Sequence, residues 1–275
     1  MALWNWIFRA GLAISAVGLV WTLWPAPGAR AYSIAYLGGR ARYHLGPRVA
    51  IDLGHYNDAA ADSRFLALGD LLTRDGYRIT RSRQHLVPEY LKEFSVLLIG
   101  NAMPYPMGTR RVAEAMGLGG LATFSADEAG AVRDWVRAGG SLLLIADAPH
   151  SGKAAAPLAA ALGATLHDCS EPVFLPDVVP AEHPIREGRS EYGEHVESVA
   201  VLASGWVETA PWAGPAVPIL KVPVDGSCVA GKSLELELEF GGGRAVVFTA
   251  QLERDEDMIR RLEPTRAGSA AGNSL

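Results

Sequence analysis

The sequence contains few cysteines and no long run of basic residues. Only 2 of its 275 residues are cysteine, Cys169 and Cys228, and its formal net charge is -5. Two cysteines this far apart exclude a C-x-x-C metal pair, and the charge pattern gives no reason to expect nucleic-acid binding. The two thiols either form a disulfide in an exported domain or stay unlinked, and both alternatives are open at this point. The 49% hydrophobic content suits one α/β domain with terminal extensions.

A long apolar run occurs at the amino terminus. Residues 10–24 are apolar apart from Ser15 and Thr22, a run shorter than the ~20 residues that span a bilayer. Ala29-Arg30-Ala31 fits a signal-peptidase site, whereas the flanking tryptophans are typical of interfacial anchors. We therefore predict a signal peptide or membrane anchor over residues 1–31. Either one places the rest of the chain in the periplasm or at the outer face of the cytoplasmic membrane, and an uncleaved segment would attach the chain to that membrane.

Alternating apolar strands and amphipathic helices begin after a linker over residues 32–47. This alternation, with short turns, predicts a doubly wound, mostly parallel α/β sheet of the flavodoxin-like kind. A capping box from Ser125 to Glu128 predicts the start of one helix, which ends at Gly139-Gly140. The expected strands are 48–53, 77–80, 95–100, 141–145 and 164–167, and the expected helices are 63–74, 88–94, 125–138 and 154–162.

The pattern changes after Cys169. Prolines mark an irregular connection, and further strands are expected at 196–202, 217–222, 233–240 and 244–249. The strict alternation of Leu and Glu over 234–239 predicts an edge or antiparallel strand with one wet face. The domain is expected to cover residues 48–255, followed by a disordered tail over 256–275. The loop at 102–124 is long enough to be functional or mobile.

Polar side chains follow three strands of the expected parallel sheet. Because the carboxyl ends of parallel strands meet at one edge, we expect these side chains to be neighbours. An Asp with two His can hold a divalent metal or perform acid–base chemistry, or the Asp residues can cap helices and the His residues can be ordinary loop side chains. No pair has the i, i+4 spacing of a helical metal site, so no metal or other cofactor is predicted. The residues are Asp52, His55, Asn57, Asn101, Asp147 and His150.

Two shorter motifs follow Asp147. Ser151 is either a nucleophile or, without a G-x-S-x-G motif, the N-cap of a helix beginning at Ala154. Gly152-Lys153 lacks the spacing of a phosphate-binding loop, which leaves only a weak anion site at the helix amino terminus.

Trp206 and Trp212 either line a carbohydrate site or fill the core.

The run Trp135–Asp147 (WVRAGGSLLLIAD) resembles the class I glutamine amidotransferase-like superfamily, and more narrowly its uncharacterised bacterial branch near the ThuA-like proteins. Residues 51–57, 71–77 and 183–185 agree in the same order, so the resemblance covers roughly residues 48–252. It implies that the His-Pro segment at His183 passes close to Asp147 and His150, although an ordinary turn is the alternative. Amidotransferases carry a Cys on a tight strand-to-helix elbow. Here the elbow is Ala146-Asp147-Ala148-Pro149, so we do not expect glutamine hydrolysis.

Three hypotheses for the function follow, and whether the chain is an enzyme stays open among them. The first is an exported domain that binds a small polar or sugar-like ligand at the strand ends. The second is a hydrolase or isomerase, with or without metal, that uses Asp147, His150 and His55. The third is an envelope protein-interaction module that uses loop 102–124 and strand 233–240. The ligand-binding residues of the first hypothesis are Asp52, Asn57, Asn101, Ser151 and His183. Neither the ligand nor the oligomeric state follows from the sequence.

Overall fold

The computed structural model describes residues 46–56, 63–106, 109–118, 121–147, 151–187, 195–224 and 227–252. All of them belong to one unit, Ala35–Leu275. The expected signal or anchor at 1–31 and the expected tail at 256–275 lie outside the described residues, as do Asn57 and His150. Across the described segments, no helix combines the length and apolar character needed to cross a membrane.

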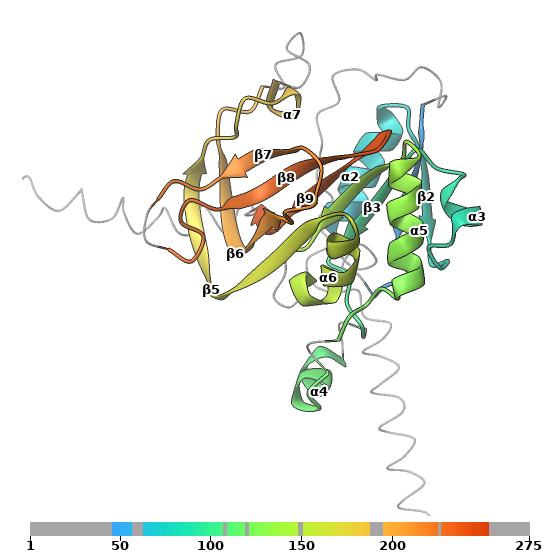
Figure 1. Cartoon of the computed structure of the whole chain (residues 1–275), viewed down its shortest axis with the longest axis horizontal. Helices are drawn as coiled ribbons and strands as arrows, with labels where there is room; N and C mark the ends of the chain where they lie inside the picture. Colours follow the sequence, from blue (N-terminus) through green and yellow to red (C-terminus); the bar gives the residue numbers. More distant parts are fainter. Residues whose placement is uncertain are drawn as a thin grey trace, which may run out of the picture. The chain divides into compact units, whose positions relative to one another are not determined.

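Five parallel strands form one half of a ten-stranded sheet, in the order β2-β1-β3-β4-β9 (Figure 1). Chain order reverses between β1 and β3, as in flavodoxin-like sheets, and ligands of such folds bind outside the carboxyl ends at this switch point. The predicted α/β class with a mostly parallel first half is therefore confirmed. The bounds are β1 (Arg48–Asp52), β2 (Arg78–Ser82), β3 (Val96–Gly100), β4 (Ser141–Ile145) and β9 (Gly243–Phe248).

The other half of the sheet is antiparallel. Strand β8 pairs with β9, β7 and the end of β6, and β6 pairs with β5 and β10. These strands are drawn in yellow to red in Figure 1. They confirm the late antiparallel strands expected from the sequence. The bounds are β5 (Ala164–Val178), β6 (Val199–Thr209), β7 (Ala216–Lys221), β8 (Ser233–Phe240) and β10 (Ala250–Leu252).

Strand β5 corrects the sequence prediction in two ways. It pairs antiparallel to β6 instead of joining the parallel strands, and it continues through the proline-containing stretch that was expected to be irregular. Pro172 and Pro176 fall within the two register shifts of this pairing, Asp168/Val173 and Leu175/Val178. Proline is tolerated in edge strands and at bulges because its missing N–H is not needed there.

Helices cover both faces of the parallel half (Figure 1). Leu68 of α2 packs on the face that carries Ile51 and Leu98, and the opposite face buries Val132 of α5 and Leu158 of α6. The capping box of α5 forms as expected, with Ser125 as N-cap and Glu128 at N3. The bounds are α2 (Ser63–Arg74), α3 (Pro88–Leu91), α4 (Arg110–Ala115), α5 (Ala126–Arg137), α6 (Ser151–Ala161) and α7 (Pro184–Glu187). Helix α4 lies within the stretch 102–124 that was expected to be a loop.

Strand β8 is antiparallel, as one of the two predicted alternatives has it, but the face that was expected to be wet is partly buried. Its three leucines are buried as predicted, but Glu237 on the opposite face is also buried, and of the three glutamates only Glu239 is exposed. His183 Nε2 lies 2.9 Å from Glu237 Oε2, and Arg244 Nη1 lies 3.3 Å from Glu237 Oε1. Burial raises the pKa of Glu235 to about 7. Strand β8 is interior because β7 and β9 pair along its two sides, so it is not an edge strand.

A disulfide joins Cys169 on β5 to Cys228, with the two Cα atoms 6.1 Å apart. The sequence left open whether these two cysteines are linked, and in the structure they are.

Candidate functional site

Buried polar side chains are concentrated at the carboxyl edge of the parallel strands. Eight polar or charged residues are buried in the described part of the chain, and seven of them lie at this edge, the exception being Glu237. Burying a polar group costs free energy unless it is hydrogen-bonded. The seven are Asp52, His55, Asn101, Asp147, Ser151, Ser204 and Thr249.

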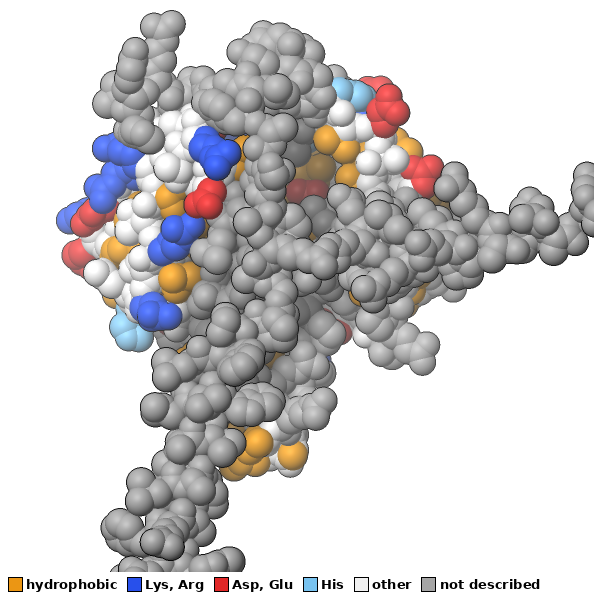
Figure 2. Space-filling view, turned by 180° about the vertical axis from the view of Figure 1, so that it is seen from behind, with side chains coloured by type: hydrophobic (Ala, Val, Ile, Leu, Met, Phe, Trp, Pro, Cys, Tyr) orange, Lys and Arg blue, Asp and Glu red, His pale blue; other side chains and the backbone are white. Residues whose placement is uncertain are grey.

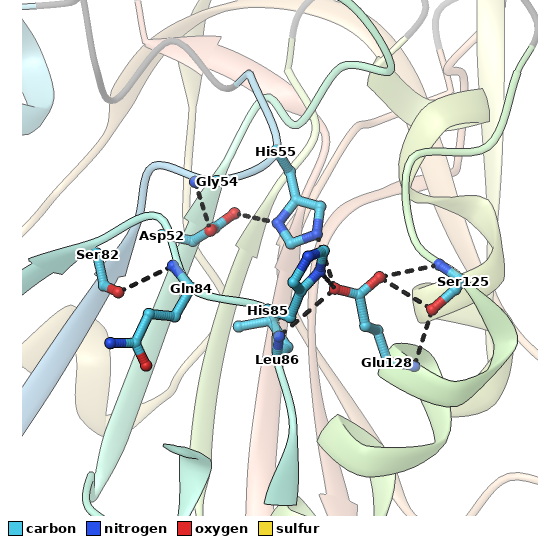
Figure 3. Close-up of polar contacts among 9 residues, drawn as sticks. All are labelled: Asp52, Gly54, His55, Ser82, Gln84, His85, Leu86, Ser125 and Glu128. Carbon is cyan, nitrogen blue, oxygen red and sulfur yellow. Dashed lines mark hydrogen bonds and ion pairs between the residues drawn. The ribbon is translucent and has the colours of Figure 1, made fainter. Parts of the chain in front are cut away.

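Asp52, the last residue of β1, orients the loop that follows it (Figure 3). Its Oδ1 accepts a hydrogen bond from the Gly54 amide at 2.9 Å, and its Oδ2 lies 2.8 Å from His55 Nδ1. The second ring nitrogen of His55, Nε2, lies 3.3 Å from Glu128 Oε1 on α5. The Phe124 ring packs on the imidazole with centroids 4.5 Å apart. The imidazole is therefore held between two carboxylates.

Glu128 is the centre of this network. Its Oε2 accepts hydrogen bonds from the Ser125 amide at 3.2 Å and the Ser125 hydroxyl at 2.9 Å. Its Oε1 also lies 3.2 Å from His85 Nδ1 (Figure 3). Burial by itself would raise the pKa of Glu128, but the hydrogen bonds from Ser125 and His85 and the charge of His55 outweigh burial and lower the pKa to about 2. Glu128 is therefore a carboxylate at every physiological pH.

The protonated form of His55 is favoured by the same arrangement. Burial lowers the pKa of an imidazole, but the hydrogen bond and charge of Asp52, together with Glu128, more than offset burial and raise the His55 pKa above its usual 6.5. Both ring nitrogens contact a carboxylate, whereas a general base needs a nitrogen that reaches the substrate. In this geometry His55 links β1 to α5 and positions their loops. The His55 backbone oxygen accepts a hydrogen bond from the Met103 amide at 2.8 Å, so His55 also holds the loop that follows β3.

Asn101 and Asp147 form a second buried pair one strand away. Asn101 Nδ2 donates to Asp147 Oδ1, and the Asp147 amide donates to Asn101 Oδ1 at 2.9 Å. The Ser204 hydroxyl donates to the Asp147 backbone oxygen at 2.7 Å. Asp147 is therefore held from β3 on one side and from β6 on the other.

The backbone at this edge is strained. Among the described residues, Tyr56 and Asn101 are the non-glycine residues with positive φ, at 44° and 51°. Asn tolerates this region, but it is an outlier for a bulky side chain such as Tyr. Strained residues of this kind cluster at ligand sites, where the surrounding structure maintains them. The two residues lie in the loops after β1 and β3, on the two sides of the switch point.

The structure corrects the expected role of Ser151. Helix α6 begins at Ser151, three residues before the expected start at Ala154, so Ser151 is its first residue and its side chain is fully buried. A Cβ on Gly152 would meet Asp168 Oδ1 at 2.5 Å. A carboxylate of the chain itself therefore lies beside the first turn of α6, where the sequence left room for a weak anion site.

The remaining predicted residues divide into three groups. Asp52 with His55 and Asn101 with Asp147 are brought together as pairs at one edge, while His183 contacts Glu237 on β8. Asn57 and His150 lie outside the described residues. Within the described ranges, no group of three or more His, Cys, Asp or Glu side chains has the geometry to hold a metal ion.

Four residues that contribute to the edge were not predicted from the sequence, namely His85, Glu128, Ser204 and Thr249. His85 follows β2, the one parallel strand of the first four for which no polar residue was predicted at the carboxyl end. Glu128 was recognised only as part of a capping box, and its second role depends on the loops that pack against α5. Ser204 lies within β6, and nothing in the local sequence marks it.

No protein-family model matches the chain, and no curated protein matches it. Similar solved structures include the N-terminal domain of mmIFT52 (10% identity, 82% of this chain and 100% of that chain, TM-score 0.48). A putative ThuA-like protein from Bacteroides uniformis has 15% identity over 86% of this chain and 94% of that one, with a TM-score of 0.45. A putative GMP synthase subunit from Thermoplasma acidophilum has 10% identity over 80% and 94%, with a TM-score of 0.43.

The two cysteines bear on whether the chain can hydrolyse glutamine. Both cysteines of the chain are joined in the disulfide, so neither provides the thiolate with which amidotransferases attack glutamine.

Proposed function

We propose that this chain is an exported amidotransferase-like domain that binds a small polar or sugar-like ligand at the carboxyl edge of β1, β3 and β4. One observation carries the proposal: seven of the eight buried polar residues in the described segments gather at this edge. The edge also coincides with the switch point of the parallel strands, where open α/β sheets bind ligands.

The chemistry of the edge favours a ligand rich in hydrogen-bond donors. Glu128 and Asp147 contribute carboxylates, and ionised carboxylates only accept hydrogen bonds. Hydroxyl groups can donate to them, and the hydroxyls of a sugar can do so at several points of the edge at once. The buried contacts between Asn101 and Asp147 hold one acceptor in place before a ligand arrives, which lowers the entropic cost of binding.

The Cys169–Cys228 disulfide supports the exported location, because disulfides form and persist in oxidising compartments. Cell fractionation tests this part of the proposal. We expect the protein in the envelope fraction without free thiols, and recovery from the cytoplasm with both thiols free would contradict export.

The binding proposal is tested with the full chain and the Asp147→Asn variant. Saturation-transfer NMR with glucose, mannose, galactose and N-acetylglucosamine should detect at least one bound sugar. Hydrogen bonds to charged groups contribute ~1.5–3 kcal/mol, so the variant should lose roughly ten- to a hundredfold in affinity. The amide keeps an acceptor for Asn101, so the fold should persist.

Glu239→Gln is the matched control, since it removes the same charge from an exposed position on β8. It should bind as the wild type does. The proposal is wrong if none of the four sugars binds, or if Asp147→Asn binds the sugar as tightly as the control.

The structure gives less support to the other two hypotheses. A hydrolase or isomerase that uses His55 needs an open ring nitrogen, and both nitrogens of His55 contact carboxylates. An interaction module that uses 233–240 as an edge strand is contradicted by the pairing of β8 along both sides.

A further inference from the structure

Strand β2 ends the parallel half of the sheet and carries an exposed set of arginines. It pairs with β1 and, among the described strands, with no other. Arginines from β1, from the end of α2 and from β2 with its following loop gather here, and Figure 2 shows several Lys and Arg side chains on this side of the molecule, with fewer Asp and Glu side chains between them. We call this set the basic edge: Arg48, Arg74, Arg78, Arg81 and Arg83.

The basic edge is positive although the whole chain has a net charge of -5. Arg48 pairs with Glu93 at 2.9 Å, and Arg81 lies 3.8 Å from Asp70. Arg74 and Arg83 are exposed and make no ion pair with any described residue. These charges therefore remain available to an external anionic partner.

Gly46, the first residue that the structure describes, lies at this edge. The Gly46 amide donates to the Gly76 oxygen at 3.1 Å, and Arg78 Nε donates to the Gly46 oxygen at 3.0 Å. Residues 25–45 separate Gly46 from the apolar segment 10–24, and at ~3.3–3.6 Å per residue they reach at most about 75 Å. An apolar segment at residues 10–24 that enters a bilayer would therefore keep the basic edge within reach of the lipid headgroups.

We propose that the basic edge docks on the anionic lipid headgroups of the membrane to which the amino-terminal segment leads. Charge complementarity and the position of Gly46 beside Arg78 support this partner. Each arginine near an anionic surface increases affinity roughly fivefold, and the attraction falls off over a Debye length of ~8 Å. The edge would then fix the orientation of the domain, which a single tether does not. The proposal does not depend on ligand binding at the carboxyl edge.

A fluorescence experiment on the full chain tests this docking. A dye is attached at Gln84→Cys, which is exposed beside Arg83 and is the one free thiol while the disulfide is intact. The chain is reconstituted into vesicles that contain a headgroup-labelled lipid acceptor. We expect higher energy transfer in vesicles of phosphatidylglycerol and phosphatidylcholine in equal parts than in phosphatidylcholine alone, and high salt should remove the difference.

Charge-reversal variants identify the surface responsible. Arg74→Glu/Arg83→Glu should remove the difference between the two lipid compositions. Lys153→Glu/Lys221→Glu changes the net charge by the same amount at exposed positions outside the basic edge. This control variant should retain the difference in energy transfer between the two lipid compositions. Circular dichroism and the melting temperature check that both variants are folded.

Three results would overturn the proposal. The first is equal energy transfer from both lipid compositions in the wild type. The second is an equal loss in the control variant, which would assign the effect to net charge alone. The third is binding of soluble polyglutamate to the edge without approach to anionic vesicles, which would assign the edge to an acidic macromolecule. If the arginines only prevent edge-to-edge strand pairing, the first result is the one expected.

Discussion

Replacement of Glu128 by glutamine is the most direct test of the network at the carboxyl edge. The Glu128 pKa is about 2 in the folded chain, against 4.5 for an ordinary glutamate, and its side chain is only 12% exposed. A difference of about 2.5 pKa units corresponds to about 3.5 kcal/mol of stabilisation by the ionised form, at ~1.4 kcal/mol for each pKa unit.

The pH dependence of this stabilisation follows from the direction of the Glu128 pKa shift. Because folding lowers the pKa, this stabilisation is fully present above pH 4.5 and is lost as the pH falls from 4.5 towards 2. Glu128→Gln lacks it at every pH. The variant should therefore be less stable than the wild type by about 3.5 kcal/mol at pH 7, and the gap should close as the pH approaches 2.

Urea unfolding followed by circular dichroism, at several pH values between 7 and 3, measures this gap. Glu239→Gln, at an exposed position of β8, is the control and should show almost no pH-dependent difference. A gap for Glu128→Gln that stays constant across this range would refute the reasoning, because the loss would then come from packing and not from the ionised carboxylate.

Two further predictions concern His55 and the disulfide. The His55 pKa is raised above 6.5, so the stability contributed by its cation is present below pH 6.5 and is lost as the pH rises through the folded pKa. NMR titration should place the His55 midpoint above 6.5, Glu128→Gln should lower that midpoint, and an unchanged midpoint would exclude the contact with Glu128. The disulfide closes a loop with a sequence separation of 59, so Cys169→Ser/Cys228→Ser should lose about 4 kcal/mol by the loop-entropy relation. Reduction of the wild type in a thermal melt should have the same effect, and a melting temperature insensitive to reductant would contradict it.

Much of the parallel half follows from local pattern. Helix α2 matches its expected range, Ser63–Arg74, because its apolar spacing and the closing Asp75-Gly76 are local features. The capping box of α5 is also local, since its donors and acceptors lie within three residues of one another. Asp52, Asn101 and Asp147 were placed at one edge correctly because strand ends of a parallel sheet have to meet there.

Other features could not be predicted because they depend on distant partners. The pairing of β5 with β6 replaced the expected parallel strand, and no local signal distinguishes the two arrangements. Glu237 was expected to face water, yet it is buried because His183 and Arg244 contact it from other parts of the chain. The start of α6 at Ser151 was likewise missed, since the buried position of Ser151 depends on packing and not on its own sequence context.

The site at the carboxyl edge shows the same division between local and tertiary information. The sequence by itself determined which polar residues follow which strands, because strand period and turn residues are local properties. Only the tertiary structure decided that Asp52 and Glu128, which are far apart in the chain, hold His55 between them and occupy both of its nitrogens. The protonation and accessibility of an imidazole depend on which groups surround it in space, and those groups come together only when the sheet, α5 and the intervening loops have packed.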